Sequence, residues 1–182
     1  MSNPRNFRGI EHIGLTVPDH DEAVRFFTRV FGAEVLYSLT DKRRDPLPGA
    51  QLAPKNGLDA ERAITAVSML RLQNGPNLEI FEIDQPRGTG ETNIAALGIS
   101  HFSLTVEDID AAARAFAAEG GRLLEGPYGL TDQEEGPGNR GHFGRTPWGL
   151  LIEFEAFGSP MRYDHPGTDG RWLPQPNQEE DA

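Results

Sequence analysis

The sequence predicts an α+β fold built from two tandem β-α-β-β-β modules. Three observations predict it: an internal repeat, an alternating apolar segment that opens each copy, and an apolar helical stripe directly after that segment. The chain has 182 residues, which corresponds to about one domain of ordinary size. We expect this domain to span residues 8–157, with repeats at 8–85 and 97–157, followed by a Pro- and Gly-rich tail at 158–182.

The internal repeat is the strongest signal in the chain. Residues 10–19, IEHIGLTVPD, align with residues 99–108, ISHFSLTVED, and the alignment continues without a gap to Gly32 and Gly121. About half of the aligned positions are identical, which is more than two unrelated segments of the same secondary structure share. The two halves of the chain are therefore expected to fold alike.

Each copy opens with a strand and continues with a helix. Apolar side chains alternate with polar ones in the opening segment, as in a strand with one buried face. In the first copy Asp19 and Glu22 can form an N-terminal capping box, and Gly32 stops the helix. In the second copy an apolar stripe over 109–117 has helical spacing. Further strands are expected at 34–39, 64–72 and 77–83 in the first copy and at 122–124, 141–145 and 149–157 in the second.

Three stretches have a loop-like composition. Residues 41–63 are polar and contain several Pro and Gly, so we expect a functional lid or a disordered excursion. Residues 126–147 are Gly-rich, and the tail from Gly158 ends in an acidic stretch that we expect to be disordered. Trp172 is expected to anchor the earlier part of the tail, because large aromatic side chains are usually buried at least in part.

Composition and charge exclude several function classes. With 17 Lys and Arg against 28 Asp and Glu the net charge is −11, and the pI of about 4.8 argues against a surface that binds nucleic acid. The absence of cysteine excludes disulfides, thiolate metal ligands and cysteine nucleophiles. No apolar run has the roughly 18 residues that a membrane span needs, and no signal peptide is visible, so a cytoplasmic location is expected.

One face of the expected sheet carries a set of chemically related side chains. The apolar residues of each strand are expected to face the helices, so the polar residues at alternate positions point to the opposite face. Four of these are His12, Glu79, His101 and Glu153. Two imidazoles and two carboxylates can hold a divalent ion such as Zn²⁺, Mn²⁺, Co²⁺, Ni²⁺ or Fe²⁺. For any one of the four alone, an exposed polar residue is the simpler interpretation, but their matched placement in two repeats favours a metal site.

Four segments of the chain resemble a known family. They are HIGLTVPD at 12–19, NLEIFE at 77–82, GISHFSLTV at 98–106 and PWGLLIEF at 147–154. They resemble the vicinal oxygen chelate superfamily, which includes glyoxalase I, methylmalonyl-CoA epimerase, extradiol dioxygenases and bleomycin- and fosfomycin-resistance proteins. The resemblance covers about residues 8–157. It implies that the two modules form a cup-shaped mixed sheet around one metal ion, with the helices on the outer face.

The resemblance also implies a ligand set and a chemistry. The metal-ligand positions of the glyoxalase and epimerase branch match this chain at His12, Glu79, His101 and Glu153. This implies a divalent-metal-dependent enzyme that acts on a small substrate with vicinal oxygens through a metal-bound enolate, as an epimerase, isomerase or lyase. Glu153 is the first candidate base, and Glu79 is its partner on the other face. Glu155 shares the face and is an alternative base, although a solvated carboxylate at the rim is the simpler interpretation.

Two other function classes stay open. A ring-cleaving dioxygenase uses Fe²⁺ held by two His and one carboxylate, and the fourth matched ligand, Glu79, argues against it. A non-catalytic protein that binds a small molecule, like the drug-sequestering relatives, needs no metal, and the complete ligand set argues against that class too. Family members often dimerise, so a homodimer is expected here, with a small-molecule substrate and with neither nucleic acid nor a membrane as partner.

Four residues are weaker candidates for substrate contacts. They are Arg71, Phe81, Ser103 and His142. Arg71 can pair with a substrate carboxylate, and His142 can contact the substrate or donate a proton, although a surface side chain is an equal interpretation of each. The Lys-Arg-Arg run at 42–44 can meet a phosphate or a CoA group. The G-x-G-x-x-G pattern at 136–141 is not followed by a helix and is rejected as a dinucleotide site.

Overall fold

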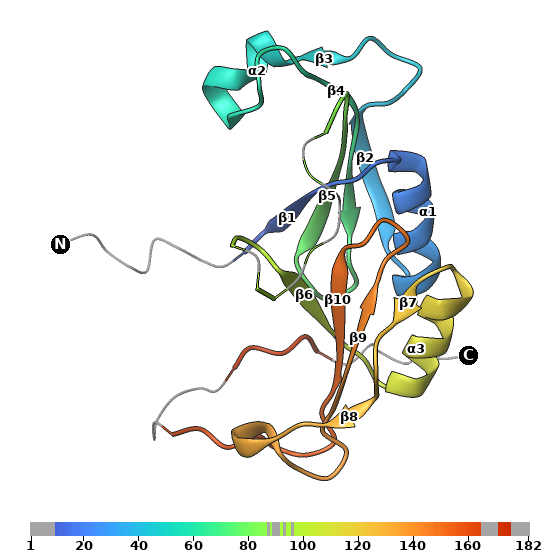
Figure 1. Ribbon diagram of the computed structural model, residues 1–182, viewed down its shortest axis with the longest axis vertical. Helices are drawn as coiled ribbons and strands as arrows, with labels where there is room; N and C mark the ends of the chain where they lie inside the picture. Colours follow the sequence, from blue (N-terminus) through green and yellow to red (C-terminus); the bar gives the residue numbers. More distant parts are fainter. Residues whose placement is uncertain are drawn as a thin grey trace, which may run out of the picture. The chain divides into compact units, whose positions relative to one another are not determined.

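The computed structural model describes residues 10–86, 88, 92, 94, 95, 97–164 and 171–175. The chain divides into two compact units, Met1–Arg87 and Gly88–Ala182, and the division falls between the two repeats. Each unit combines helix with a mixed sheet, so the predicted α+β class with two tandem modules is confirmed (Figure 1). No helix in the described part of the chain is long and apolar enough to cross a membrane.

The first unit is a mixed sheet with a helix packed against it. Its elements are β1 (His12–Thr16), α1 (His20–Phe31), β2 (Glu34–Thr40), β3 (Leu47–Pro48), α2 (Gly49–Asn56), β4 (Ala63–Arg71) and β5 (Asn77–Ile83). The strand order is β1-β5-β4-β2, and β3 also pairs with β4. Strands β1 and β5 run parallel, and the other pairs are antiparallel.

The second unit repeats this arrangement. Its elements are β6 (His101–Thr105), α3 (Ile109–Ala118), β7 (Arg122–Leu123), β8 (Tyr128–Gly129), the 3-10 helix η2 (Asp132–Glu134), β9 (Arg140–Arg145) and β10 (Leu151–Ala156). The strand order β6-β10-β9-β7, with β8 added on β9, corresponds strand by strand to that of the first unit. Strands β6 and β10 are again the parallel pair. The repeat seen in the sequence is therefore a repeat of topology.

Each helix buries the apolar stripe that the sequence predicts. Phe27 in α1 and Phe116 in α3 occupy repeat-related positions, and both are fully buried. Phe116 packs edge to face on Phe154 of β10, with 5.2 Å between ring centroids. The predicted cap of α1 is also present: the Asp19 carboxylate accepts a hydrogen bond from the Glu22 N–H at 2.8 Å. Burial of these stripes against one face leaves the other face of each sheet for polar side chains.

Residues 41–63 differ from the predicted irregular excursion, because they contain β3 and α2. Gly49 begins α2, and its N–H donates to the Arg62 carbonyl oxygen at 2.7 Å. A Cβ at this position would lie 2.1 Å from the Asp59 carbonyl oxygen, so the approach requires glycine. The prediction missed α2 because this short helix has only Gly49 buried and contains Pro54.

The expectation that Trp172 anchors the tail is wrong. Its side chain is 70% exposed. The neighbouring Arg171 holds this part of the chain instead, through contacts with Glu134 and Glu155. An arginine can do this because its guanidinium donates up to five hydrogen bonds. The tail end at 176–182, where disorder is expected, lies outside the described residues.

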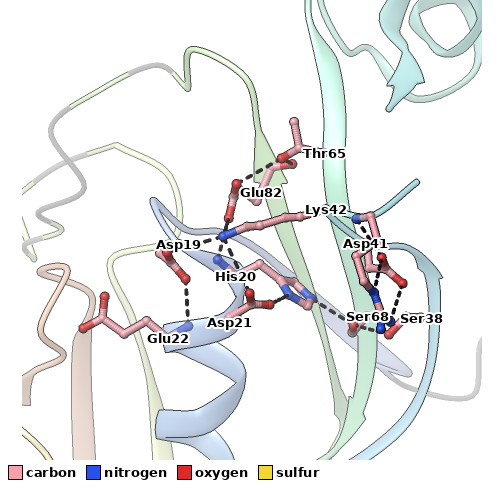
Figure 2. Close-up of polar contacts among 11 residues, drawn as sticks. Asp19, His20, Asp21, Glu22, Ser38, Asp41, Lys42, Thr65, Ser68 and Glu82 are labelled. Carbon is pink, nitrogen blue, oxygen red and sulfur yellow. Dashed lines mark hydrogen bonds and ion pairs between the residues drawn. The ribbon is translucent and has the colours of Figure 1, made fainter. Parts of the chain in front are cut away.

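A polar network fixes the start of α1 to the sheet (Figure 2). The Glu82 carboxylate on β5 accepts the His20 N–H at 2.7 Å and pairs with the Lys42 ammonium group at 2.9 Å. The buried His20 ring lies 2.8 Å from the Ser68 hydroxyl oxygen. Lys42 is therefore bound within the fold, whereas its neighbours Arg43 and Arg44 pair with Asp41. These ion pairs give the basic run a structural use within the first unit.

Replacing Glu82 by alanine is expected to lower the free energy of unfolding by about 2 kcal/mol, because three donors lose a charged, half-buried acceptor. Urea denaturation of the variant measures this loss. Glu61→Ala is the matched control, since Glu61 is an exposed glutamate, and its change should stay within about 0.5 kcal/mol. Equal losses in the two variants would contradict a special role of Glu82.

Candidate active site and metal centre

The polar face of the first unit carries one of the two predicted His–Glu pairs. The parallel register of β1 and β5 places Gly14 opposite Glu79. His12 precedes Gly14 by two residues and therefore lies on the same face. The Nε2 atom of His12 lies 3.5 Å from the Glu79 carboxylate oxygen. Both side chains are part-exposed, at 41% and 21%. The two side chains lie on one face, as the alternation in the sequence predicts, and their role as ligands stays a prediction.

The polar face of the second unit carries the matching pair. Ser103 lies opposite Glu153 in the parallel register of β6 and β10, and His101 lies on the same face. The Nε2 atom of His101 lies 3.4 Å from the Glu153 carboxylate oxygen. The His101 ring also packs edge to face on Phe143 of β9, at 5.3 Å between centroids. The two units thus present the same donor pair at nearly the same separation.

In both units the other ring nitrogen of the histidine is engaged by the residue directly before it. The Nδ1 of His12 lies 2.5 Å from the Glu11 carboxylate, and the Nδ1 of His101 lies 2.8 Å from the Ser100 hydroxyl oxygen. The bond to Glu11 raises the pKa of His12. Because a carboxylate only accepts, Nδ1 of His12 donates the hydrogen bond to Glu11, which leaves Nε2 as the candidate ligand atom. Glu11 and Ser100 escaped the sequence analysis, although they occupy aligned positions in the repeat.

The chemistry of these donors fits a divalent ion. Imidazole nitrogens and carboxylate oxygens are donors that divalent transition metals accept, and each unit places one of each within 3.5 Å. Within the described residues there is no group of three or more His, Asp or Glu that could hold an ion. The four-ligand set that the sequence suggests therefore stays a prediction.

Glu153 has an environment that favours its protonated form. Burial is the main cause that raises its pKa, and the negative charge of Glu155 is the second, while His101 opposes both. Burial is the main cause that raises the pKa of Tyr128, and the negative charges of Glu153 and Glu155 add to it. Tyr128 was not predicted. It reaches this place because β8 pairs with β9 at Gly141, where a Cβ would lie 2.8 Å from the tyrosine ring.

Glu155 differs from the solvated rim carboxylate that the sequence suggested. Only 5% of the residue is exposed. Its carboxylate accepts a hydrogen bond from the Ser103 hydroxyl at 2.6 Å and one from the Arg171 guanidinium at 2.9 Å. Ser103, a predicted substrate contact, is thus engaged by Glu155. The sequence missed Arg171 because a contact from the tail to a strand has no local pattern.

The remaining predicted substrate contacts differ in the face on which they lie and in their exposure to solvent. Phe81 lies on the same face as Glu79 and packs beside Gly14. Arg71 is exposed near the end of β4, two residues beyond Met69, which pairs with Glu79. His142 is on the opposite, buried face with 3% exposed, and its Nε2 lies 3.0 Å from the Leu124 carbonyl oxygen. This burial contradicts the expected substrate contact of His142.

The sequence of the chain is similar to those of known proteins. A family model described as the Glyoxalase/Bleomycin resistance protein/Dioxygenase superfamily matches residues 9–154. A 2-epi-5-epi-valiolone epimerase from Actinomyces sp is 38% identical over 148 residues, which cover 79% of this chain and 76% of that protein.

Solved structures have the same fold. A glyoxalase family protein from Bacillus cereus superposes with a TM-score of 0.66 at 19% identity, over 85% of this chain and 98% of the other. A mutant of the genomically encoded fosfomycin resistance protein FosX from Listeria monocytogenes, in complex with Mn(II) and 1S,2S-dihydroxypropylphosphonic acid, superposes with a TM-score of 0.51 at 16% identity, over 82% of this chain and 90% of the other. At these identities the likeness concerns the fold alone.

Proposed function

The chain belongs to the Glyoxalase/Bleomycin resistance protein/Dioxygenase superfamily, and from this premise we propose that it is an epimerase that inverts a carbon next to a carbonyl group in a small ketone with vicinal oxygens. The observation that carries the proposal is the 38% identity to a 2-epi-5-epi-valiolone epimerase over most of both chains. The two matched His–Glu pairs support it, because they offer a carboxylate in each unit.

Epimerisation next to a carbonyl needs a base that removes a proton and an acid that returns one to the opposite face of the same carbon. Glu153 is the proposed base. Its raised pKa, caused first by burial, brings the carboxylate nearer in strength to what proton abstraction from carbon requires.

Glu79 is the proposed acid, since it is the counterpart of Glu153 in the other repeat. It pairs with His12 as Glu153 pairs with His101. The carbon-bound proton passes to the Glu153 carboxylate, the electron pair moves toward the carbonyl oxygen, and the Glu79 carboxyl delivers a proton to the other face. Exchange with solvent then restores both glutamates. In the reverse direction the two residues exchange roles.

The residues present fit a divalent ion, with His12 and His101 as nitrogen ligands and Glu79 and Glu153 as oxygen ligands. Such an ion would polarise the carbonyl oxygen of the substrate and acidify the neighbouring C–H. A carboxylate has two oxygens, so one can serve as ligand while the other takes or gives the proton. Glu11 and Ser100 would hold the two imidazole rings in orientation.

The alternatives are less well supported by the same residues. A dioxygenase site of two His and one carboxylate would leave one of the two glutamates without a use. A protein that merely binds a small molecule has no need of a His–Glu pair in each unit. The homodimer that the family resemblance implies stays a prediction, and light scattering of the purified protein checks it.

The test is an isotope experiment with 2-epi-5-epi-valiolone as substrate in D₂O. The protein is loaded separately with Mn²⁺, Co²⁺, Ni²⁺, Zn²⁺ or anaerobic Fe²⁺, and NMR follows inversion and deuterium at the inverted carbon. We expect inversion accompanied by one deuteron, and loss of both after chelation of the ion. Absence of inversion and of exchange with every ion would overturn the proposed function.

A further inference from the structure

Arg171 connects the C-terminal segment to the polar face of the second unit. Its Nη2 donates to the buried Glu155 carboxylate at 2.9 Å, and its Nη1 donates to Glu134 of η2. The guanidinium also lies 5.0 Å from the centre of the Phe157 ring, as in a cation–π contact. The backbone N–H of Arg171 donates to the Tyr163 hydroxyl at 3.0 Å. One residue thus joins η2, the end of β10 and the segment that follows.

Glu155 needs such a partner. It is 5% exposed, and burying a carboxylate is costly unless hydrogen bonds and a positive charge compensate. The Ser103 hydroxyl and the Arg171 guanidinium both donate to the same oxygen, Oε2. Of these two donors only Arg171 brings a charge. The orientation of the Glu155 carboxylate therefore depends on a residue of the tail.

Glu155 lies beside the proposed base. Glu153 and Glu155 are alternate residues of β10 and share one face, which separates them by about 7 Å along the strand. Arg171 thus contacts Glu155, which lies on the same face of β10 as the proposed base, Glu153.

We propose that Arg171 is a positioning residue for the reaction, which holds Glu155 in a fixed orientation beside Glu153 and closes the C-terminal segment onto the second unit. This inference rests on the proposed function. Arg171 also forms one wall of a cavity of about 260 Å³, together with Glu134, Met161 and Tyr163. Since Met161, Tyr163 and Arg171 all belong to the tail, release of Arg171 should loosen the tail on this side of the second unit.

The test is a double-mutant cycle on Arg171 and Glu155, with R171M, E155Q and the double variant assayed for epimerisation. R171M is expected to lower kcat about tenfold and to change KM less than about threefold, because a misplaced group affects the chemical step more than binding. R171K should recover most of kcat, since its ammonium group can still pair with Glu155. The double variant should be no slower than the slower single variant, because Arg171 acts through Glu155.

Arg162→Met is the matched control. Arg162 lines the same cavity and also belongs to the tail, but its side chain contacts the Asp132 carbonyl oxygen and Glu135, so kcat should stay within about twofold of wild type. Effects of R171M and E155Q that multiply in the double variant, or an R171M enzyme with wild-type kcat, would overturn the positioning role.

Hydrogen exchange followed by mass spectrometry separates this inference from the proposed function, because it needs no substrate. In R171M, but not in R162M, the peptides over 155–164 and 171–175 should exchange faster than in wild type. An inactive wild-type protein with this exchange pattern would reject the epimerase and retain the closure by Arg171. Unchanged exchange in R171M would reject the closure whatever the activity of the wild-type enzyme.

Discussion

Replacing Glu153 by glutamine is expected to lower kcat for epimerisation about 10³-fold, since a positioned general base contributes roughly 10² to 10⁴ to the rate. The amide of glutamine has the size of the carboxylate but cannot accept the carbon-bound proton. The measurement is steady-state kinetics by NMR at saturating metal, so that weaker ion binding does not enter kcat. Thermal unfolding checks that the variant is folded.

The corresponding change in the other repeat gives a different signature. Glu79→Gln is expected to abolish inversion and yet to leave exchange of the substrate proton with solvent deuterium, because Glu153 still removes the proton and returns it to the same face. A Glu79 variant that loses exchange and inversion together would contradict the division of roles. Equal losses of kcat in Glu153→Gln and Glu155→Gln would make Glu155 a candidate for the base.

Substitution of either histidine by alanine is expected to weaken binding of the divalent ion more than about 100-fold, because loss of a ligand should exceed the 10- to 100-fold effect of losing a residue that only orients one. Wild-type protein should retain about one ion per chain after dialysis. His12→Ala and His101→Ala should each retain almost none, since both pairs are proposed to hold the same ion. Elemental analysis and calorimetric titration measure these quantities.

Two further variants calibrate this result. Glu11→Gln removes the charge behind His12 and should weaken binding by only about 10- to 100-fold. Arg71→Ala removes an exposed side chain near the same pair and should leave the affinity unchanged. If each histidine variant still retained one ion per chain, the two pairs would not share an ion, and the four-ligand centre would be wrong.

The part of the site that lies on regular strands was predictable from the sequence. Alternation along β1 and β5, with the repeat to confirm it, places His12 and Glu79 on one face, and the structure pairs them. The same reasoning holds for His101 and Glu153. The prediction succeeds because side-chain direction in a strand depends only on position parity.

The part of the site that depends on loops was not predictable in this way. Tyr128 comes from a strand of two residues, too short for a pattern, and Arg171 comes from the irregular tail. His142 was a wrong candidate because it fills a buried position beside Gly126, where a Cβ would lie 2.7 Å from the imidazole ring. Contacts between segments distant in sequence decide all three placements, and local periodicity carries no information about them.

Each repeat carries one His–Glu pair, and this equal division bears on how the proposed metal centre arose and on how ion binding depends on protein concentration. A primordial chain with a single module would own one histidine and one glutamate, and two such chains would have to associate before an ion had four ligands. Duplication and fusion convert that association into an intramolecular one, which no longer depends on protein concentration. The two copies differ in the residue behind each histidine, which is Glu11 in the first and Ser100 in the second. In the proposed four-ligand centre, the Kd for the ion should accordingly be the same at micromolar and at nanomolar protein concentration.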